Sequence, residues 1–149
     1  MAIGEICNRE VVIVQRDTTI QEAAKLMRSH HAGALVVVKE VAGKRHPVGL
    51  VTDRDLVIEV LAPELDASVI TVGDIMLPKP VTVTETTGVF EAIQFMRDKA
   101  VRRLPVVDGQ GALIGIVALD DLLSLLADEL SELSTLVTRE QKREMDSRH

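Results

Sequence analysis

A threonine and a carboxylate, Thr52 and Asp55, stand three residues apart directly after an apolar, β-rich run. This spacing brings both side chains to the start of a helix, where free N–H groups and the helix dipole favour a phosphate. A carboxylate at that point can accept hydrogen bonds from both hydroxyls of a cis-diol. The pair also fits a capping box, with Thr52 as the N-cap and Asp55 as the third helical residue, and the two interpretations are compatible.

Basic side chains form a second candidate group. Arg102 and Arg103 stand directly before the apolar run Leu104–Val107, and Arg54 stands next to Asp55. Arginine binds phosphate in bidentate geometry, which makes it a natural phosphate clamp. The alternative is that these arginines form surface ion pairs with acidic neighbours, which contribute little to stability.

The elements that must position these side chains occur twice. Residues 3–38 align with residues 72–107, and after a short insertion at Lys39–Pro47 the segment Gly49–Leu56 aligns with Gly115–Leu122. Identical pairs include Gly4/Gly73, Thr18/Thr87, Glu22/Glu91, Met27/Met96 and Leu35/Leu104. One register held over this length, with a single insertion, indicates an internal duplication.

Each copy predicts a β-α-β-β-α unit. The first helix has apolar residues at i, i+3, i+4 and i+7, which is the spacing of one buried stripe. These residues are Ile20, Ala23, Ala24 and Met27 in the first copy and Val89, Ala92, Ile93 and Met96 in the second. The expected strands are residues 11–14, 35–38 and 48–52, and then 81–84, 104–107 and 113–118; the final helices are 53–61 and 119 onward.

The predicted fold class is α/β (α+β), with the duplicated β-α-β-β-α units packed sheet to sheet around a pseudo-twofold axis. The strands are nearly continuous apolar runs, so both faces of each small sheet should be buried. A unit of about 60 residues is marginal on its own, so two copies are expected to share one core.

This arrangement resembles a tandem pair of CBS domains, a family named after cystathionine beta-synthase, whose pairs are often called Bateman modules. The resemblance rests on Gly49–Asp55, its degenerate copy Gly115–Asp121, the segment Arg102–Asp108 and the lead-in Val72–Met76. It divides the chain into CBS domain 1 (3–65), CBS domain 2 (72–127) and a C-terminal helical extension with a charged tail (128–149). It implies a stand-alone regulatory protein that binds an adenine nucleotide and is not an enzyme.

The resemblance also implies roles for single residues. Asp55 would accept hydrogen bonds from ribose hydroxyls, and the Thr52 hydroxyl would donate to phosphate. Arg102 and Arg103 would reach across the pseudo-twofold axis to the phosphate at the Thr52/Asp55 site.

The second copy departs from the family pattern. Ala118 replaces the threonine, which leaves Asp121 as the ribose ligand, and the positions that match the arginine pair are Gly33 and Ala34. The two sites of the pair are therefore expected to differ.

Adenine would lie in an apolar slot lined by Val14 and Leu35, together with Val12 and the counterparts Val81, Val83 and Leu104. Backbone amides near Ala34 or Arg103 would read the edge of the base. AMP, ADP and ATP are the leading ligands; NAD and S-adenosylmethionine are the alternatives. No metal is expected to be required, since adjacent histidines such as His30 and His31 point in different directions on a helix.

Composition excludes several other classes. The net charge of −6 and the aromatic content of two Phe with no Tyr or Trp argue against nucleic-acid binding. A single cysteine, Cys7, cannot form an internal disulfide, and no apolar run is long enough to span a membrane. A cytoplasmic location is therefore the expectation.

The C-terminal segment predicts a heptad seam along one helix. Its members are Leu119, Leu123, Leu126, Leu130, Leu133 and Val137. Packing on the chain's own sheet explains the first half, whereas Leu130, Leu133 and Val137 are expected to contact a second subunit in a homodimer. The charged tail after Thr138 is either a solvated helix end or disordered. The main hypothesis is a nucleotide sensor that signals to a protein partner, and the alternative is a ligand-free dimerisation or docking module.

Overall fold

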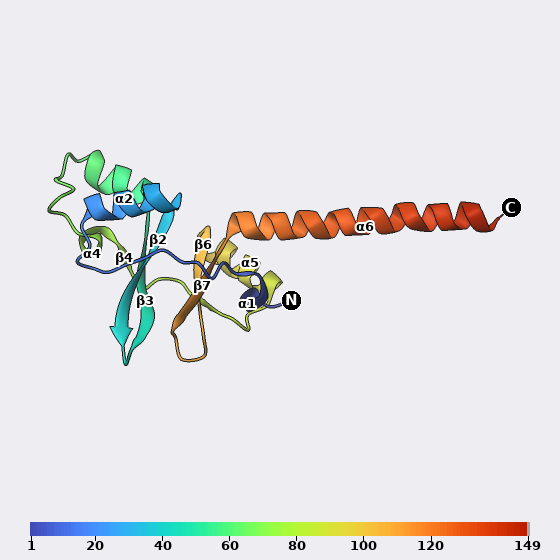
Figure 1. Ribbon diagram of the computed structural model, residues 1–149, viewed down its shortest axis with the longest axis horizontal. Helices are drawn as coiled ribbons and strands as arrows, with labels where there is room; N and C mark the ends of the chain where they lie inside the picture. Colours follow the sequence, from blue (N-terminus) through green and yellow to red (C-terminus); the bar gives the residue numbers. More distant parts are fainter. Residues whose placement is uncertain (149) are drawn as a thin grey trace. The chain divides into compact units, whose positions relative to one another are not determined.

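The computed structural model describes residues 1–148 and separates into two compact units (Figure 1). The first unit is Met1–Val117, and it contains both β-sheets and all helices except the last. The second unit begins at Ala118 and is one long helix. Each unit is described by itself below.

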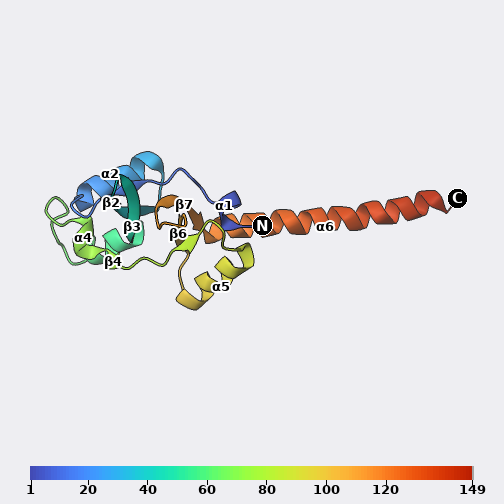
Figure 2. The same cartoon turned by 90° about the horizontal axis from the view of Figure 1, so that it is seen from below.

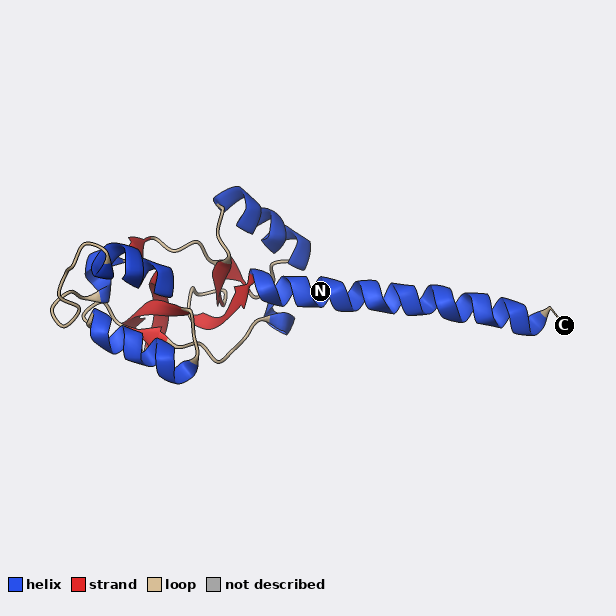
Figure 3. Ribbon diagram, turned by 90° about the horizontal axis from the view of Figure 1, so that it is seen from above, coloured by secondary structure: helices blue, strands red, loops and turns tan. Residues whose placement is uncertain are grey.

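The first sheet contains four strands in the order β1-β2-β3-β4. The strands are β1 (Ile13–Val14), β2 (Ala34–Val41), β3 (Lys44–Thr52) and β4 (Leu77–Pro78). β1 runs parallel to β2, and the helix α2 (Ile20–His30) makes the crossover that a parallel pair requires (Figure 3). β2 and β3 form an antiparallel hairpin, and β4 lies antiparallel to β3.

The second sheet repeats this plan with three strands in the order β5-β6-β7. The strands are β5 (Val83–Thr84), β6 (Arg103–Val107) and β7 (Leu113–Ala118), and α5 (Val89–Lys99) connects the parallel pair β5 and β6. The mixed α/β fold with two sheets confirms the fold class predicted from the duplication.

α2 shows why the apolar spacing forms a helix at this point. Thr19 is the N-cap, and its hydroxyl accepts a hydrogen bond from the Glu22 N–H at 3.2 Å. Ile20, Ala23 and Met27 are buried, as their spacing predicted, whereas Ala24 is exposed, because it lies at the edge of the stripe.

The hairpin of β2 and β3 is longer than the sequence predicted. Residues 39–47 were expected to form a loop, but the strands continue to Val41 and resume at Lys44. The turn residues Ala42 and Gly43 both have positive φ, 52° and 77°, as the tight turns of two-residue hairpins require. The insertion in the first copy therefore lengthens a hairpin rather than a loop.

The helix predicted at 53–61 is present as two consecutive parts. α3 (Asp53–Leu56) is α-helical, and η1 (Val57–Leu61) continues it with the wider π-type hydrogen bonding. Val60 is the buried member of this second part.

A short helix opens each copy, and neither was predicted. α1 (Ile3–Ile6) donates hydrogen bonds into the second copy, from Ile3 N–H to Thr87 O at 2.8 Å and from Gly4 N–H to Glu85 O at 2.9 Å. The segment after α1 stays with the second copy, because Asn8 pairs with Ile116 of β7.

α4 (Val72–Ile75) makes the equivalent contacts with the first copy. Val72 N–H donates to Thr18 O and Gly73 N–H donates to Arg16 O, both at 2.8 Å. The segment after α4 contributes β4, in which Leu77 pairs with Leu50 of β3. Each copy therefore gives its lead-in segment to the other, and this reciprocal exchange relates the two copies.

The core of the first copy is aliphatic, as the scarcity of aromatic residues predicted. It consists of Val14, Ile20, Ala23, Met27, Leu35, Val37, Val51, Val60 and Val72. Val72 belongs to α4, so the exchanged segment is part of this core. No polar or charged side chain is buried within residues 1–148.

The second unit is α6 (Leu119–Ser147), a helix of 29 residues. The charged tail after Thr138 continues this helix, so of the two predicted states the helical one is present. Every described residue from 127 onward is exposed. No helix within residues 1–148 combines the length and apolar character needed to cross a membrane.

Candidate functional site

Thr52 and Asp55 meet where β3 ends and α3 begins. Thr52 N–H donates to Asp55 Oδ2 at 2.8 Å, and Asp55 N–H donates to the Thr52 hydroxyl at 3.2 Å. The predicted capping box is therefore present. It leaves Asp55 Oδ1 without a hydrogen bond inside the part of the chain that the structure describes, so the carboxylate retains an acceptor for a ligand.

Carboxylate capping by itself does not distinguish this site. The same contact, from the N-cap N–H to the acidic residue three positions later, occurs at Ala2–Glu5, Thr71–Asp74 and Ala118–Asp121. A structural cap explains all four, so a ligand site at Thr52 needs a feature that the other three do not share.

Arg103 supplies that feature. Asp53 N–H donates to Gly33 O at 3.0 Å, and Ala34 stands opposite Thr52 in the ladder of β2 and β3. A Cβ atom added to Gly33 would lie 3.2 Å from Arg103 Nη2 and 3.4 Å from Asp53 Oδ2. A guanidinium from the second copy thus lies beside the Thr52–Asp55 turn of the first copy.

The side chains of Arg54 and Arg102 make no polar contact with the described residues. Both side chains are exposed, and neither guanidinium forms a hydrogen bond or ion pair with residues 1–148. Only the backbone of Arg54 is fixed, since its N–H donates to Asp53 Oδ1 at 2.8 Å. Among the three predicted arginines, Arg103 is the one that the fold brings to the turn.

The predicted slot residues differ in exposure. Leu35 is fully buried in the core, Val14 is nearly so at 4% exposed, and Ala34 and Val12 are half-buried. Half-buried side chains next to the turn are the ones that a bound base can reach without opening the core. The role of these residues as a base slot stays a prediction.

The amino-acid sequence matches a known protein family. The CBS domain family matches the chain over residues 3–62 and 72–128, which covers both copies and most of the chain. The chain belongs to the CBS domain family. This match confirms the resemblance drawn from Gly49–Asp55 and Arg102–Asp108.

Curated relatives of this CBS pair come from archaea, bacteria and eukaryotes. It is 40% identical over 125 residues to an uncharacterised protein of Methanopyrus kandleri, which covers 84% of this chain but 62% of that protein. It is 36% identical over 121 residues to the CBS domain-containing protein YhcV of Bacillus subtilis, which covers 81% of this chain and 82% of the relative. The chain thus spans less than two thirds of the Methanopyrus protein.

Solved structures with the same fold differ in oligomeric state, bound metal ions and bound ligand. A hexameric CBS-CP12 protein from bloom-forming cyanobacteria is 30% identical with a TM-score of 0.74, covering 83% of this chain and 66% of that one. Hypoxic Response Protein I with two coordinated zinc ions is 32% identical with a TM-score of 0.71, covering 83% and 98%. CBSX2 in complex with AMP is 24% identical with a TM-score of 0.73, covering 85% and 97%, which shows the fold alone.

The zinc-bound neighbour makes metal binding a question for this CBS pair. Within residues 1–148, no three His, Cys, Asp or Glu side chains gather in a way that could hold a metal ion. His30 ends α2 and His31 is its left-handed cap, with φ of 52°. The expectation that no metal is required stays a prediction.

The second copy of the CBS pair has lost the hydroxyl at the equivalent turn. Ala118 N–H donates to Asp121 Oδ2 at 3.0 Å, which matches the contact between Thr52 and Asp55. Ala118 offers no hydroxyl to a phosphate, and Asp121 caps the helix of the second unit. The role of Asp121 as a ribose ligand stays a prediction.

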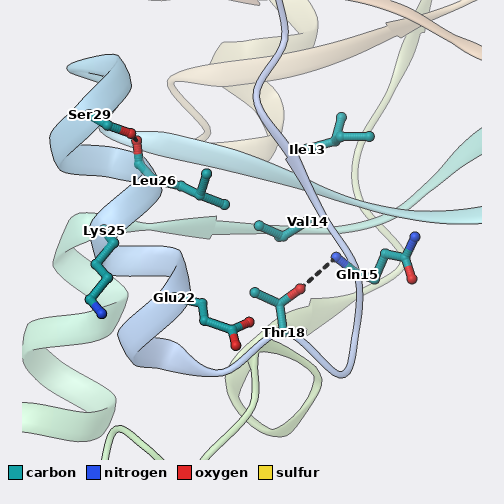
Figure 4. Close-up of a pocket in the computed structure, with 8 residues that line it drawn as sticks. All are labelled: Ile13, Val14, Gln15, Thr18, Glu22, Lys25, Leu26 and Ser29. Atoms are coloured by element: carbon teal, nitrogen blue, oxygen red, sulfur yellow. Dashed lines mark hydrogen bonds between the residues drawn. The ribbon is translucent and has the colours of Figure 1, made fainter.

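An open cavity of about 630 Å³ lies between β1 and the outer face of α2 (Figure 4). Its lining residues are Ile13, Val14, Gln15, Thr18, Glu22, Lys25, Leu26 and Ser29. The Thr18 hydroxyl points toward Gln15 and accepts a hydrogen bond from its N–H at 3.1 Å. Val14 is the one predicted site residue in this lining. The cavity is therefore a separate feature from the cluster formed by the Thr52–Asp55 turn and Arg103.

Sequence reasoning missed two contributors to the cluster, Gly33 and Asp53. Gly33 was noted as an uncharged counterpart of Arg102, and Asp53 as an acidic residue at a helix start. The glycine itself was the available signal, because a residue without a side chain in a strand region marks a close approach of another group.

Proposed function

We propose that this CBS pair is a regulatory sensor that binds an adenine nucleotide at the Thr52–Asp55 turn. AMP, ADP and ATP are the leading ligands, with NAD and S-adenosylmethionine as alternatives. The position of Arg103 carries the proposal, because it adds a phosphate-binding group from one copy to a ribose-binding carboxylate from the other.

Each side chain has a distinct task in this proposal. Asp55 Oδ1 accepts from a ribose hydroxyl, while Oδ2 keeps its hydrogen bond to Thr52 N–H. The Thr52 hydroxyl, which accepts from Asp55 N–H, has its own proton free to donate to a phosphate oxygen. Arg103 then pairs with the phosphate in the bidentate geometry that guanidinium favours.

Asp53 sets the electrostatic condition for binding. Its carboxylate faces the same space at Gly33 as Arg103 does, so an incoming phosphate meets one positive and one negative group. Repulsion from Asp53 grows with the charge of the ligand, which favours AMP over ATP at this site.

Two further observations support the proposal. The fold itself holds AMP in the CBSX2 complex. The reciprocal exchange of α1 and α4 ties each copy to the other, so a ligand that bridges the copies would bias their packing. A signal of this kind requires that the ligand bind two packing states with different affinity. The regulated protein partner and the cytoplasmic location stay predictions.

Calorimetric titration tests the proposal. AMP, ATP, NAD, S-adenosylmethionine and adenosine are titrated into the wild type, Asp55→Ala and the matched control Asp74→Ala. The control removes the same cap contact at Thr71, at the start of α4 rather than at the Thr52–Asp55 turn. We expect micromolar binding of one nucleotide that Asp55→Ala abolishes and Asp74→Ala preserves. Absence of binding by every adenosine compound at millimolar concentration would refute a sensor role.

The exposed apolar side chains of α6 favour one alternative function, a ligand-free docking module. Truncation after Leu126 separates the two functions. A variant that loses self-association but still binds nucleotide shows that sensing and assembly are separate. A variant that loses association, in a protein that binds no nucleotide, supports the docking module.

A further inference from the structure

α6 carries an apolar surface that nothing in the described chain covers. Leu130, Leu133, Leu136 and Val137 are 67%, 59%, 59% and 55% exposed. They fall within one stretch of two helical turns and repeat at spacings of three and four, which places them on one face. Large apolar side chains gathered in this way mark a surface that binds another apolar surface.

The shape of this surface fits a second helix. Leu123, Leu126, Leu130, Leu133 and Val137 alternate spacings of three and four, which is the a and d seam of a coiled coil. The helix is about 43 Å long, so it offers several turns for pairing. Leu136 directly precedes Val137 and widens the seam on the g side.

The residues that continue the seam determine whether two paired helices would run parallel or antiparallel. Glu140 and Glu144 occupy the next two seam positions after Val137. In a parallel, in-register pair each glutamate would face the same glutamate of the other helix. Two layers of like charge would then follow the apolar layers. An antiparallel pair brings each glutamate to an apolar residue of the other helix, where its methylene groups pack and its carboxylate reaches solvent.

Charge along α6 favours the same orientation. Glu129 and Glu132 make its middle acidic, whereas in residues 139–143 the basic Arg139, Lys142 and Arg143 outnumber the one acidic residue, Glu140. An antiparallel pair centred between Leu133 and Val137 sets the acidic segment of each helix beside the basic segment of the other.

We propose that α6 binds a second copy of itself as an antiparallel coiled coil centred between Leu133 and Val137. Leu133 of each helix packs on Val137 of the other, and the two Leu136 side chains meet at the centre. Glu129 and Arg143 both occupy g positions, which face each other in antiparallel pairs, so each Glu129 forms an ion pair with Arg143 of the second copy. This assembly does not depend on nucleotide binding.

A charge-reversal cycle on the full chain tests the pairing. Within one helix Glu129 and Arg143 are about 21 Å apart, so they interact only between copies. Glu129→Arg and Arg143→Glu each create two repulsive contacts in a dimer, and each should weaken self-association roughly tenfold by sedimentation equilibrium. The double variant should return to within about twofold of the wild type. Asp128→Arg, an equal charge change on the outer face, is the matched control.

Cysteine cross-linking gives the orientation directly. In a Cys7→Ser background, Glu129→Cys and Arg143→Cys chains are mixed and oxidised. Mixed disulfides that form faster than either like-with-like disulfide are the expected result. Like-with-like disulfides alone would establish a parallel pair and overturn the proposal. Additive losses in the charge-reversal cycle, or no disulfide of any kind, would also overturn it.

Discussion

The guanidinium of Arg103 lies directly against Gly33, since a Cβ atom at Gly33 would stand only 3.2 Å from Arg103 Nη2. The two residues belong to different copies of the CBS pair, and the counterpart of Gly33 in the second copy is Arg102. The glycine in one copy therefore leaves the space that an arginine from the other copy fills. This relationship makes the two potential ligand sites unequal.

Gly33→Val should weaken nucleotide binding without unfolding the protein. The added side chain meets the far end of a flexible arginine rather than backbone, so Arg103 moves away from the turn at little cost to stability. We expect AMP affinity to fall about threefold to tenfold, because a charge-assisted hydrogen bond is lost. Calorimetry measures this effect. Gly109→Val, at a glycine with open space around it, should leave affinity unchanged, and equal loss in both variants would contradict the role of Gly33.

Substitution of lysine for each arginine should separate their roles. Arg103→Lys keeps the charge but loses the fork that binds phosphate in two places, so AMP affinity should fall about tenfold while adenosine affinity holds. Arg102→Lys should change AMP affinity by less than about twofold, because its exposed side chain has no contact at the turn. Parallel titrations of AMP and adenosine distinguish phosphate binding from a general loss of the site. An equal effect of both substitutions would assign the phosphate to the pair.

The exchanged lead-in helices should be sensitive to one added methyl group. A Cβ atom at Gly73 would lie 2.9 Å from Arg16 O, and one at Gly4 would lie 2.9 Å from Glu85 O. Backbone cannot move aside as a side chain can, so Gly73→Ala and Gly4→Ala should each lower the free energy of unfolding by about 1–3 kcal/mol. Denaturant unfolding with Gly109→Ala as the control checks this. Two separate transitions in the wild type would show that the copies do not stabilise each other.

Asp108 should make folding stability fall in acid. N–H groups of Ala112 and Gln110, at 3.0 and 2.9 Å, hold the pKa of the Asp108 carboxyl below its usual range, and the positive charges of Lys44 and His46 act in the same direction. The stabilisation is present above the pKa of the unfolded chain, about 3.9, and disappears as the pH falls through the lower native pKa. Asp108→Asn should therefore lose less stability than the wild type in this window. Carbon NMR titration of the carboxyl gives the native pKa directly, and a value at or above that of a free aspartate would contradict the prediction.

Much of the fold followed from periodicity in the sequence. The stripe that includes Ile20, Ala23 and Met27 forms a buried helix face, and the aligned repeat gives the second sheet the plan of the first. Thr52 and Asp55 meet as their spacing predicted, because a capping box is a local structure that needs no tertiary information.

Structure that depends on contacts between distant residues could not be predicted from the sequence. Ile3 and Val72 align with each other, so the repeat could not show that Val72 joins the core of the first copy or that the buried Ile3 donates its N–H to Thr87 O of the second. The helices α1 and α4 are four residues long and too short to form without tertiary contacts. Charged residues such as Lys39, Glu40 and Arg45 gave no strand pattern, and cross-strand pairing in the hairpin, rather than local preference, makes them β.

Exchange of the lead-in segments also determines how this protein can be divided. A cut in the exposed stretch between Pro63 and Asp66 would yield two fragments, each carrying the segment that closes the other's sheet. Neither fragment would keep its full set of strand partners alone, whereas together they would restore them. The boundary between the repeats is thus a natural split point for a complementation reporter, in which reassembly of two separately made halves reports their encounter.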